Sequence, residues 1–394
     1  MGVLRLREFR LFFIAQAVSG LGDRTVPIAL AFAVLELGGS PTDVGLVLTA
    51  RMVPLVATLL IGGVVADRLP RRAVMVVADA SRLLTQGALA ALLIAGAAEI
   101  WTVALLAGLT GAAGGFFTPA AVGLLPALVP AEDLQEANGL RATVMSGGEI
   151  AGPALAGVLI ASVGAGWALA IDAVSFGLSA ALLVLLRVPA VERVAGSFLA
   201  DLREGWEIFR SLTWVWTFVL AASFGNLLWS AWNVLGPVVA ERELGGAAAW
   251  GTVLAALGAG TLLGGLIALR ARPRRPLLFA SATLVLFAFG PALLAAGAPV
   301  GAVAVGALGA GLSMMLSNTV WESSLQRYAP PGALSRVSAY DWFGSLLGGA
   351  VGMMVWGPIA ELIGISAALW LVAALMVAST LALLAVPAIR RLGT

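Results

Sequence analysis

The sequence contains no cysteine, no histidine and no lysine, and charged residues make up only 11% of its 394 positions. The absence of cysteine excludes disulfides, thiol catalysis and cysteine-ligated metals. The absence of histidine removes the side chain that most often shuttles protons or binds metals. Proton chemistry would therefore have to use carboxylates, and we expect no metal site and no cofactor.

Hydrophobic residues dominate instead, at 60% of the chain with a mean hydropathy of +1.01. Soluble domains carry about 25% charged residues, so a soluble enzyme, a nucleic-acid-binding protein and a disordered chain are all excluded. The net charge of only +2 agrees, because it gives no reason to expect a nucleic-acid partner. The composition indicates a polytopic membrane protein that contacts the lipid bilayer.

The chain contains twelve continuous apolar stretches, each long enough to cross a bilayer as a helix of about 20 residues. A β-barrel would alternate apolar and polar residues over shorter segments. We therefore predict an all-α fold of twelve transmembrane helices. They fall near residues 11–36, 43–66, 73–97, 101–126, 137–163, 166–187, 213–240, 249–269, 276–297, 299–322, 337–361 and 366–388.

The arginines predict the orientation of these helices. With the N-terminus inside, nineteen of the 23 basic residues fall in cytoplasmic segments, and only Arg242 lies outside. The remaining three, Arg24, Arg51 and Arg82, fall within predicted spans. This asymmetry follows the positive-inside rule and places both termini in the cytoplasm. The alanine- and glycine-rich, lysine-free composition suggests a bacterial inner (cytoplasmic) membrane.

The two halves of the sequence resemble each other at an offset slightly above 200, with a Gly-Gly pair at 62 and 264 and a Gly-Pro pair at 152 and 357. Two parallel copies of six helices are typical of transporters whose substrate site lies between the halves. The repeat predicts an N-terminal bundle at 1–187, a cytoplasmic amphipathic linker at 188–212 and a C-terminal bundle at 213–394.

The string GGVVADRLPRR, residues 62–72, lies between the second and third predicted helices. It resembles the cytoplasmic gating motif of the major facilitator superfamily, Gly-x3-Asp-Arg-x-Gly-Arg-Arg/Lys, with proline at one glycine position. We expect the first glycine of the motif to allow close helix packing and its aspartate to pair with arginines or a helix N-terminus. The matching residues are Gly63, Asp67, Arg68, Arg71 and Arg72.

The string GEIAGPALAG, residues 148–157, resembles the motif of drug:proton antiporters in that superfamily. The resemblance implies export, although a packing kink without directional meaning is an alternative interpretation. The matching residues are Gly148, Gly152, Pro153 and Gly157. The chain is most similar to the macrolide-efflux and enterobactin-exporter-like branch, judged by SGLGDR at 19–24 and LVPAEDLQEANGL at 128–140. It departs from many such antiporters in having no charge at 101–126, where they carry an arginine.

Acidic residues within the predicted spans concentrate in the first half. Counting residues along the helices puts Asp23 and Glu149 near the bilayer midplane, and both are predicted to carry protons. Asp172 lies closer to the outer surface, so we expect it to be more exposed and hold it in reserve. Arg51 is a candidate charge partner for Asp23 or Glu149. Permanently paired structural carboxylates are the alternative.

Two further charges, Asp79 and Arg82, lie three residues apart on one predicted helix, where we expect a structural pair. In the superfamily that the motifs resemble, the first and seventh helices line the central cavity. Polar, aromatic and methionine residues there and on the tenth helix are candidates for substrate binding, with plain packing as the alternative. They are Gln16, Asn226, Trp229, Asn233, Met314 and Asn318.

Together, the residues and the resemblance predict a proton-coupled secondary active exporter, an antiporter. Its substrates would be amphiphilic or hydrophobic small molecules such as drugs, macrolides or siderophores, moved by alternating access through a monomer. The alternatives are an uncoupled or uptake-type facilitator and a lipid or lysolipid transporter on the same fold. A membrane-embedded enzyme or sensor is disfavoured because histidine, cysteine and nucleotide-binding motifs are absent.

Overall fold

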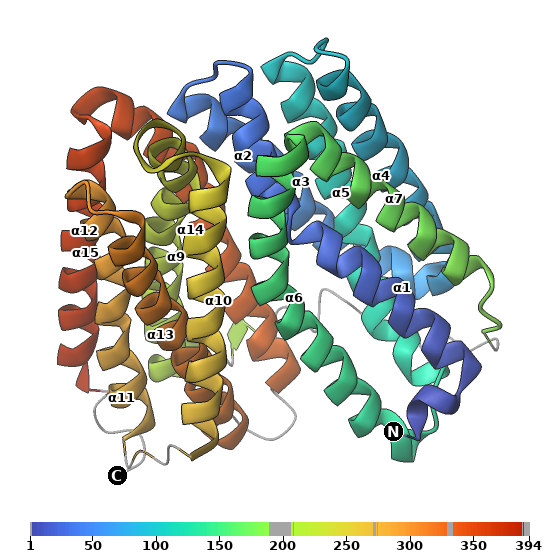
Figure 1. Cartoon of the computed structure of the whole chain (residues 1–394). Helices are drawn as coiled ribbons and strands as arrows, with labels where there is room; N and C mark the ends of the chain where they lie inside the picture. Colours follow the sequence, from blue (N-terminus) through green and yellow to red (C-terminus); the bar gives the residue numbers. More distant parts are fainter. Residues whose placement is uncertain are drawn as a thin grey trace. The chain divides into compact units, whose positions relative to one another are not determined.

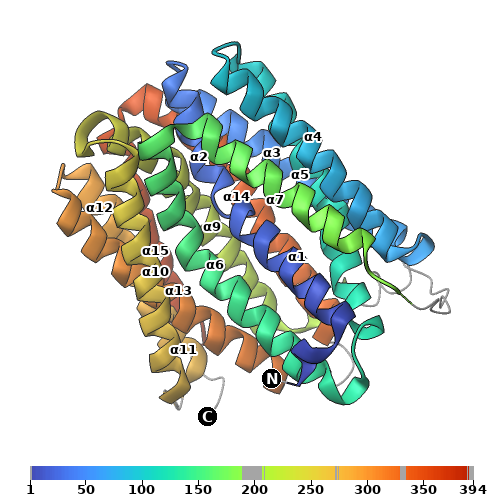
Figure 2. The same cartoon turned by 45° about the vertical axis from the view of Figure 1, so that its right-hand side comes forward.

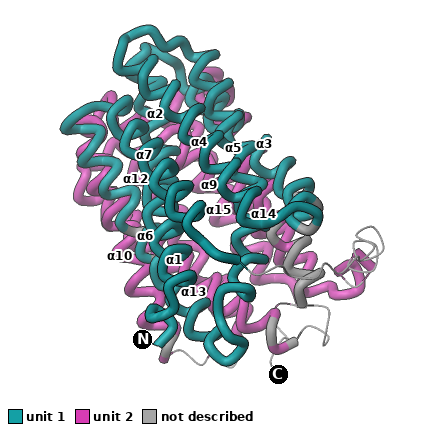
Figure 3. The backbone as a smooth tube through the Cα atoms, turned by 90° about the vertical axis from the view of Figure 1, so that its right-hand side faces the viewer, with its two compact units in different colours: residues 1–194 teal, residues 195–394 magenta. Residues whose placement is uncertain are grey.

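The computed structural model describes residues 2–188, 206–207, 209–270, 273, 275–328, 334–387 and 389. Helices account for nearly all of these residues, and no strand occurs among them. The chain forms two compact units, Met1–Val194 and Ala195–Thr394 (Figure 1 and Figure 3). Most of the predicted linker at 188–212 lies outside the described residues.

The first unit contains seven long helical segments, joined by short turns and 3-10 helices. Its N-terminal stretch is divided in two, and the other segments match the remaining predicted spans of this half. The helices are α1 (Arg7–Asp23), α2 (Val26–Glu36), α3 (Pro41–Arg68), α4 (Arg71–Ile94), α5 (Ile100–Leu124), α6 (Leu134–Val163) and α7 (Ala165–Val184).

The second unit repeats this pattern with two irregular stretches, a π-helix at Ala240–Leu244 and a 3-10 stretch at Leu284–Ala288. The 3-10 stretch joins two short helices that together form one predicted span. The helices are α9 (Thr213–Val239), α10 (Ala247–Arg270), α11 (Pro276–Thr283), α12 (Phe289–Ala295), α13 (Val300–Tyr328), α14 (Leu334–Ile363) and α15 (Ile365–Ala385).

Within the described part of the chain, eleven segments are long and apolar enough to cross a membrane. The twelfth predicted span corresponds to α6, in which Ala151–Val163 is an apolar segment among the described residues. With 30 residues and a rise of about 1.5 Å per residue, α6 is nevertheless long enough to span. The predicted all-α, multi-pass membrane fold is confirmed.

The internal repeat is visible in the turns. Gly164, between α6 and α7, has φ of 86°, and Gly364, between α14 and α15, has φ of 89°. Side chains disfavour this backbone region, so both turns require glycine. A glycine with positive φ thus forms the corresponding turn in each unit, 200 residues apart.

Glycines also set the helix packing in both units. An added Cβ at Gly62 of α3 would lie 2.5 Å from the Gly115 carbonyl of α5, and one at Gly264 of α10 would lie 2.5 Å from the Leu312 carbonyl of α13. Within the first unit, Gly62 makes this close contact with α5, and the predicted Gly63 does not. A Cβ there would meet no described atom within 4 Å, because successive residues turn by about 100° around a helix.

Each unit has its own apolar core. In the first unit, Phe9 and Phe12 of α1 are fully buried against Met75 of α4 and Leu183 of α7. Figure 2 shows α1 lying along α7 and α6. In the second unit, Phe218 of α9 stacks on Trp321 of α13 with ring centroids 4.2 Å apart. These cores hold the helices that carry the polar residues described next.

Candidate functional site

The site in the first unit begins with a break in the N-terminal span. Pro27 has no N–H with which to bond the carbonyl of Asp23 four residues earlier, and its ring obstructs a continuing helix. Helix α1 therefore ends at Asp23 and α2 begins at Val26. The N–H and the hydroxyl of Thr25 both donate to the Gly22 carbonyl, at 2.8 Å each. The break leaves the Asp23 side chain facing the helices packed beside α1.

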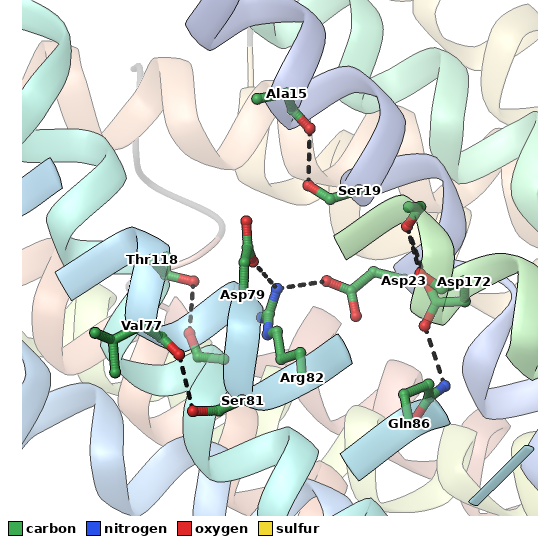
Figure 4. A network of polar contacts seen from close by, with 12 residues as sticks. Ala15, Ser19, Asp23, Val77, Asp79, Ser81, Arg82, Gln86, Thr118 and Asp172 are labelled. Atoms are coloured by element: carbon green, nitrogen blue, oxygen red, sulfur yellow. Dashed lines mark hydrogen bonds and ion pairs between the residues drawn. The ribbon is translucent and has the colours of Figure 1, made fainter. Parts of the chain in front are cut away.

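Four charged side chains from three helices meet at this break, and we refer to Asp23, Arg51, Asp79 and Arg82 as the ion cluster. Arg51 Nη2 on α3 donates to Asp23 Oδ1 at 3.0 Å. Arg82 Nη1 on α4 lies 3.4 Å from Asp23 Oδ2 and 3.6 Å from Asp79 Oδ1. Figure 4 shows Arg82 between the two carboxylates. Two cations and two anions balance within the cluster.

Arg82 occupies a closely fitted site. Its guanidinium carbon lies 5.1 Å from the ring centroid of Phe117 on α5 and 4.8 Å from that of Phe176 on α7. A Cβ on Gly114 of α5 would lie 2.5 Å from Arg82 Nη2. Only 7% of the arginine side chain is exposed. Aromatic faces and a glycine therefore hold the cation where it reaches two acids.

The structure places Arg51 on Asp23, and it places Arg82 on Asp79 as the i,i+3 spacing indicates. What the sequence did not reveal is that Arg82 is shared with Asp23. Sharing depends on which face of α4 points toward α1. The i, i+3, i+7 spacing of Asp79, Arg82 and Gln86 was the available signal, since it puts all three on one face.

Asp172 on α7 lies next to the ion cluster and is only 1% exposed. Gln86 Nε2 donates to its Oδ2 at 3.0 Å, and the Ser175 hydroxyl donates to its main-chain carbonyl at 2.7 Å (Figure 4). The prediction that Asp172 is more exposed is wrong. Helix α1 covers it at Gly22, where a Cβ would collide with Asp172 Oδ1.

Helix α6 packs against the same break through its predicted antiporter motif. Gly152 lies against Arg24, so a Cβ there would collide with the Cβ of the arginine. A Cβ at Gly148 would meet no described atom within 4 Å, whereas Gly157 is buried and Pro153 lies inside the continuous helix. The backbone of Glu149 belongs to α6, but its side chain lies outside the described ones. One glycine of the motif thus positions α6 beside residue 24.

The predicted gating motif forms the turn from α3 to α4. Helix α3 ends at the exposed Arg68, and Pro70 precedes α4. Arg71 Nη1 donates to the Gly123 carbonyl at 2.5 Å, and Arg72 Nη2 donates to the Val184 carbonyl at 2.6 Å. Both acceptors lie at helix C-termini, where cations are favoured. The two arginines fasten the ends of α5 and α7, while the Asp67 side chain lies outside the described ones.

The candidate substrate residues have varied surroundings. Gln16 is buried, and its Oε1 accepts from Arg141 Nε at 2.8 Å. On α9, Asn226 Nδ2 donates to the Ser345 carbonyl at 3.2 Å. The Trp229 ring stacks on that of Trp232, with ring centroids 5.4 Å apart. The remaining candidates are the half-buried Asn233 of α9, the half-buried Met314 of α13 and the exposed Asn318 of α13.

Residues 12–353 match the family described as Major Facilitator Superfamily. The chain belongs to the major facilitator superfamily. Relatives include an uncharacterized MFS-type transporter, YfiS of Bacillus subtilis, which is 27% identical over 370 residues, covering 90% of this chain and 87% of the relative. The resemblance noted in the sequence motifs is therefore confirmed.

Two other relatives of this superfamily member are named as efflux proteins. The multidrug efflux pump Tap of Mycolicibacterium fortuitum is 31% identical over 160 residues, which is 39% of each chain. Macrolide efflux protein A of Streptococcus pyogenes is 22% identical over 265 residues, covering 66% of this chain and 65% of the relative. The chain thus spans less than two thirds of the length of these two proteins.

Solved structures of other transporters share the superfamily fold. A mutant of the peptide transporter POT superimposes with a TM-score of 0.79 at 12% identity, covering 97% of this chain and 95% of that one. A mutant of the nucleoside transporter NupG gives a TM-score of 0.75 at 14% identity, covering 97% of this chain and 99% of that one. At such identities the likeness establishes the fold alone.

Proposed function

We propose that this superfamily member is a proton-coupled secondary active exporter of amphiphilic or hydrophobic small molecules. The observation that carries the proposal is the set of charged side chains gathered inside the first unit, around Asp23 and Asp172. Ionisable groups within transmembrane segments are costly, and where they occur they commonly belong to ion or proton pathways. With no histidine in the chain, carboxyls are the available proton carriers.

The efflux relatives support the substrate class, because their names specify multidrug and macrolide efflux. The apolar, aromatic and methionine side chains of α9 and α13 suit ligands of varied shape, since such surfaces adapt to different apolar partners. We propose drugs, macrolides or siderophores as substrates, contacted by the candidate residues of α1, α9 and α13.

Transport would proceed by alternating access, in a monomer whose termini face the cytoplasm of a bacterial cell. Asp23, Glu149 and Asp172 are the candidate carriers, and protons entering from outside would drive the substrate out. The turn between α3 and α4, fastened by Arg71 and Arg72, would close the cytoplasmic side.

The test uses the full chain reconstituted in liposomes. A thermal-shift screen of macrolides, siderophores, dyes and lysolipids first identifies the compounds that raise Tm, with erythromycin and ethidium as the initial probes. An imposed proton gradient is then expected to accumulate the selected probe in the more acidic compartment, because substrate and proton move in opposite directions.

The alternatives give different results in the same assay. Equal rates with and without the gradient would identify an uncoupled facilitator. Accumulation in the alkaline compartment would identify proton-driven uptake. Selective movement of lysolipid would assign the protein to lipid transport. Each of these results contradicts the proposed exporter.

A further inference from the structure

Asp23 and Asp172 lie close together but differ in burial and in partners. The Asp23 side chain is 26% exposed, whereas Asp172 is only 1% exposed. Asp23 contacts two guanidinium groups, those of Arg51 and Arg82. Asp172 has no ion-pair partner among the described residues and is held instead by the amide of Gln86. The contrast separates an acid that is neutralised by cations from one that is not.

The partners of Asp23 fit only its ionised form. Guanidinium groups donate and cannot accept, and their bonds to a carboxylate depend on its charge. Within the ion cluster, two anions already balance two cations. A proton on Asp23 would leave an uncompensated positive charge beside Arg82, whose side chain is nearly fully buried. The contacts of Asp23 in the cluster are therefore those of a carboxylate.

The partner of Asp172 fits both protonation states. A glutamine amide donates through Nε2 and accepts through Oε1. In the structure Nε2 donates to Asp172 Oδ2, while Gln86 Oε1 is buried and has no hydrogen-bond partner in the described part of the protein. A carboxylic acid O–H is a donor that could satisfy this orphaned acceptor once the amide turns over to present Oε1. Gln86 can thus hold Asp172 with or without a proton.

The surrounding charges leave no spare cation for Asp172. Arg51 and Arg82 are engaged by the ion cluster, and Arg141 of α6 donates to Gln16. An ionised Asp172 would therefore add one unbalanced negative charge to a balanced group. The charged or titratable groups on the elements around it include Asp23 of α1, Arg24 beside α6, Glu36 of α2 at the start of α7, Arg51 of α3, Asp79 and Arg82 of α4, and Arg141 and Glu149 of α6.

We propose that Asp172 is the carboxyl that takes up and releases the transported proton, and that Gln86 is the positioning residue that accommodates both of its states. Asp23 serves instead as the counterion of Arg51 and Arg82. This assignment rests on the proposed proton coupling and specifies its site. Because Asp172 Oδ1 lies against Gly22, a change in its protonation acts directly on the end of α1, next to the ion cluster.

The experiment is infrared difference spectroscopy of the purified full chain between acidic and alkaline buffer, which detects the C=O band of a protonated carboxylic acid. We expect wild-type protein to show a band that disappears in alkaline buffer. Asp172→Asn should abolish it, and Asp23→Asn should retain it. Asp172→Glu should retain a shifted band, which keeps the test valid if the asparagine variant does not fold.

Gln86→Leu tests the positioning role. It should retain the band but displace the pH at which it disappears, whereas a purely structural glutamine would leave that pH unchanged. Thr85→Val is the matched control, since the described hydrogen bonds of the Thr85 hydroxyl are to main-chain carbonyls of α4 and with the Thr110 hydroxyl. We expect its titration to match wild type.

A band that persists in Asp172→Asn, or that is lost in Asp23→Asn or Asp79→Asn instead, overturns the assignment, as does the absence of any titrating band. The measurement requires no transported substrate. If Asp172 titrates as expected but a proton gradient does not drive transport, then the proposed exporter fails and the titration site stands.

Discussion

The two units share a backbone plan but differ in the chemistry of their interiors. In the repeat, Leu21-Gly22-Asp23 of the first unit corresponds to Phe224-Gly225-Asn226 of the second. Asn226, at the position of Asp23, bonds the Ser345 carbonyl rather than an arginine. Near Asn226 the second unit has packed aromatic rings. The ring centroid of Trp232 lies 5.4 Å from that of Trp229, on which it stacks, and 4.8 Å from that of Trp250, to which it is tilted. Glycine turns and glycine helix contacts recur in both units, whereas the described part of the second unit has no counterpart of the ion cluster. The repeat therefore preserves the scaffold and leaves side-chain function free to diverge.

The largest expected effect comes from removing the shared cation of the first unit. Arg82→Leu leaves Asp79 and Asp23 with a single arginine, and deleting one partner of a buried ion pair costs about 3–5 kcal/mol. The free energy of unfolding, measured by detergent denaturation, should fall by this amount. Arg242→Leu, at an exposed arginine of the second unit, should stay within about 0.5 kcal/mol of wild type. If Arg82→Leu lowered the free energy of unfolding no more than Arg242→Leu does, the ion cluster would add no stability beyond that of an exposed arginine.

A second prediction uses two glycines that the repeat pairs. In Gly22→Ala the new methyl group collides with Asp172 Oδ1, and overpacking of this kind costs about 1–3 kcal/mol. In Gly225→Ala the methyl meets no described atom within 4 Å. Thermal denaturation of both variants should therefore show a lower Tm only for Gly22→Ala. A comparable decrease at Gly225 would show that the two sites are packed alike.

These contrasts also show how far the sequence predicted the structure. Apolar runs and arginine asymmetry located the helices, because hydrocarbon thickness and backbone hydrogen bonding leave few alternatives. The break after Asp23 was not predicted, although Pro27 was its signal. Which of Gly62 and Gly63 packs against α5, and which acids Arg82 contacts, depend on how each helix is rotated about its own axis. One residue corresponds to about 100° of this rotation. The apolar pattern of a single sequence does not specify it.

The smallest effect is expected from making the second unit resemble the first. Asn226→Asp removes the amide donor to the Ser345 carbonyl, and an ordinary hydrogen bond contributes about 1 kcal/mol. No arginine pairs with this position in the described part of the second unit. The unfolding free energy should therefore fall by about this amount, and the infrared band assigned to Asp172 should be unchanged. A loss as large as that of Arg82→Leu would contradict the view that position 226 is only weakly constrained.

The aromatic content of the second unit has a spectroscopic consequence. Ten of the twelve tryptophans lie after residue 195, and the other two, Trp101 and Trp167, are exposed near helix ends of the first unit. Intrinsic fluorescence therefore reports mainly on the unit that lacks the ion cluster. An emission change that follows a pH jump in wild type but not in Asp172→Asn would measure how strongly protonation in one unit is communicated to the other, without any added label.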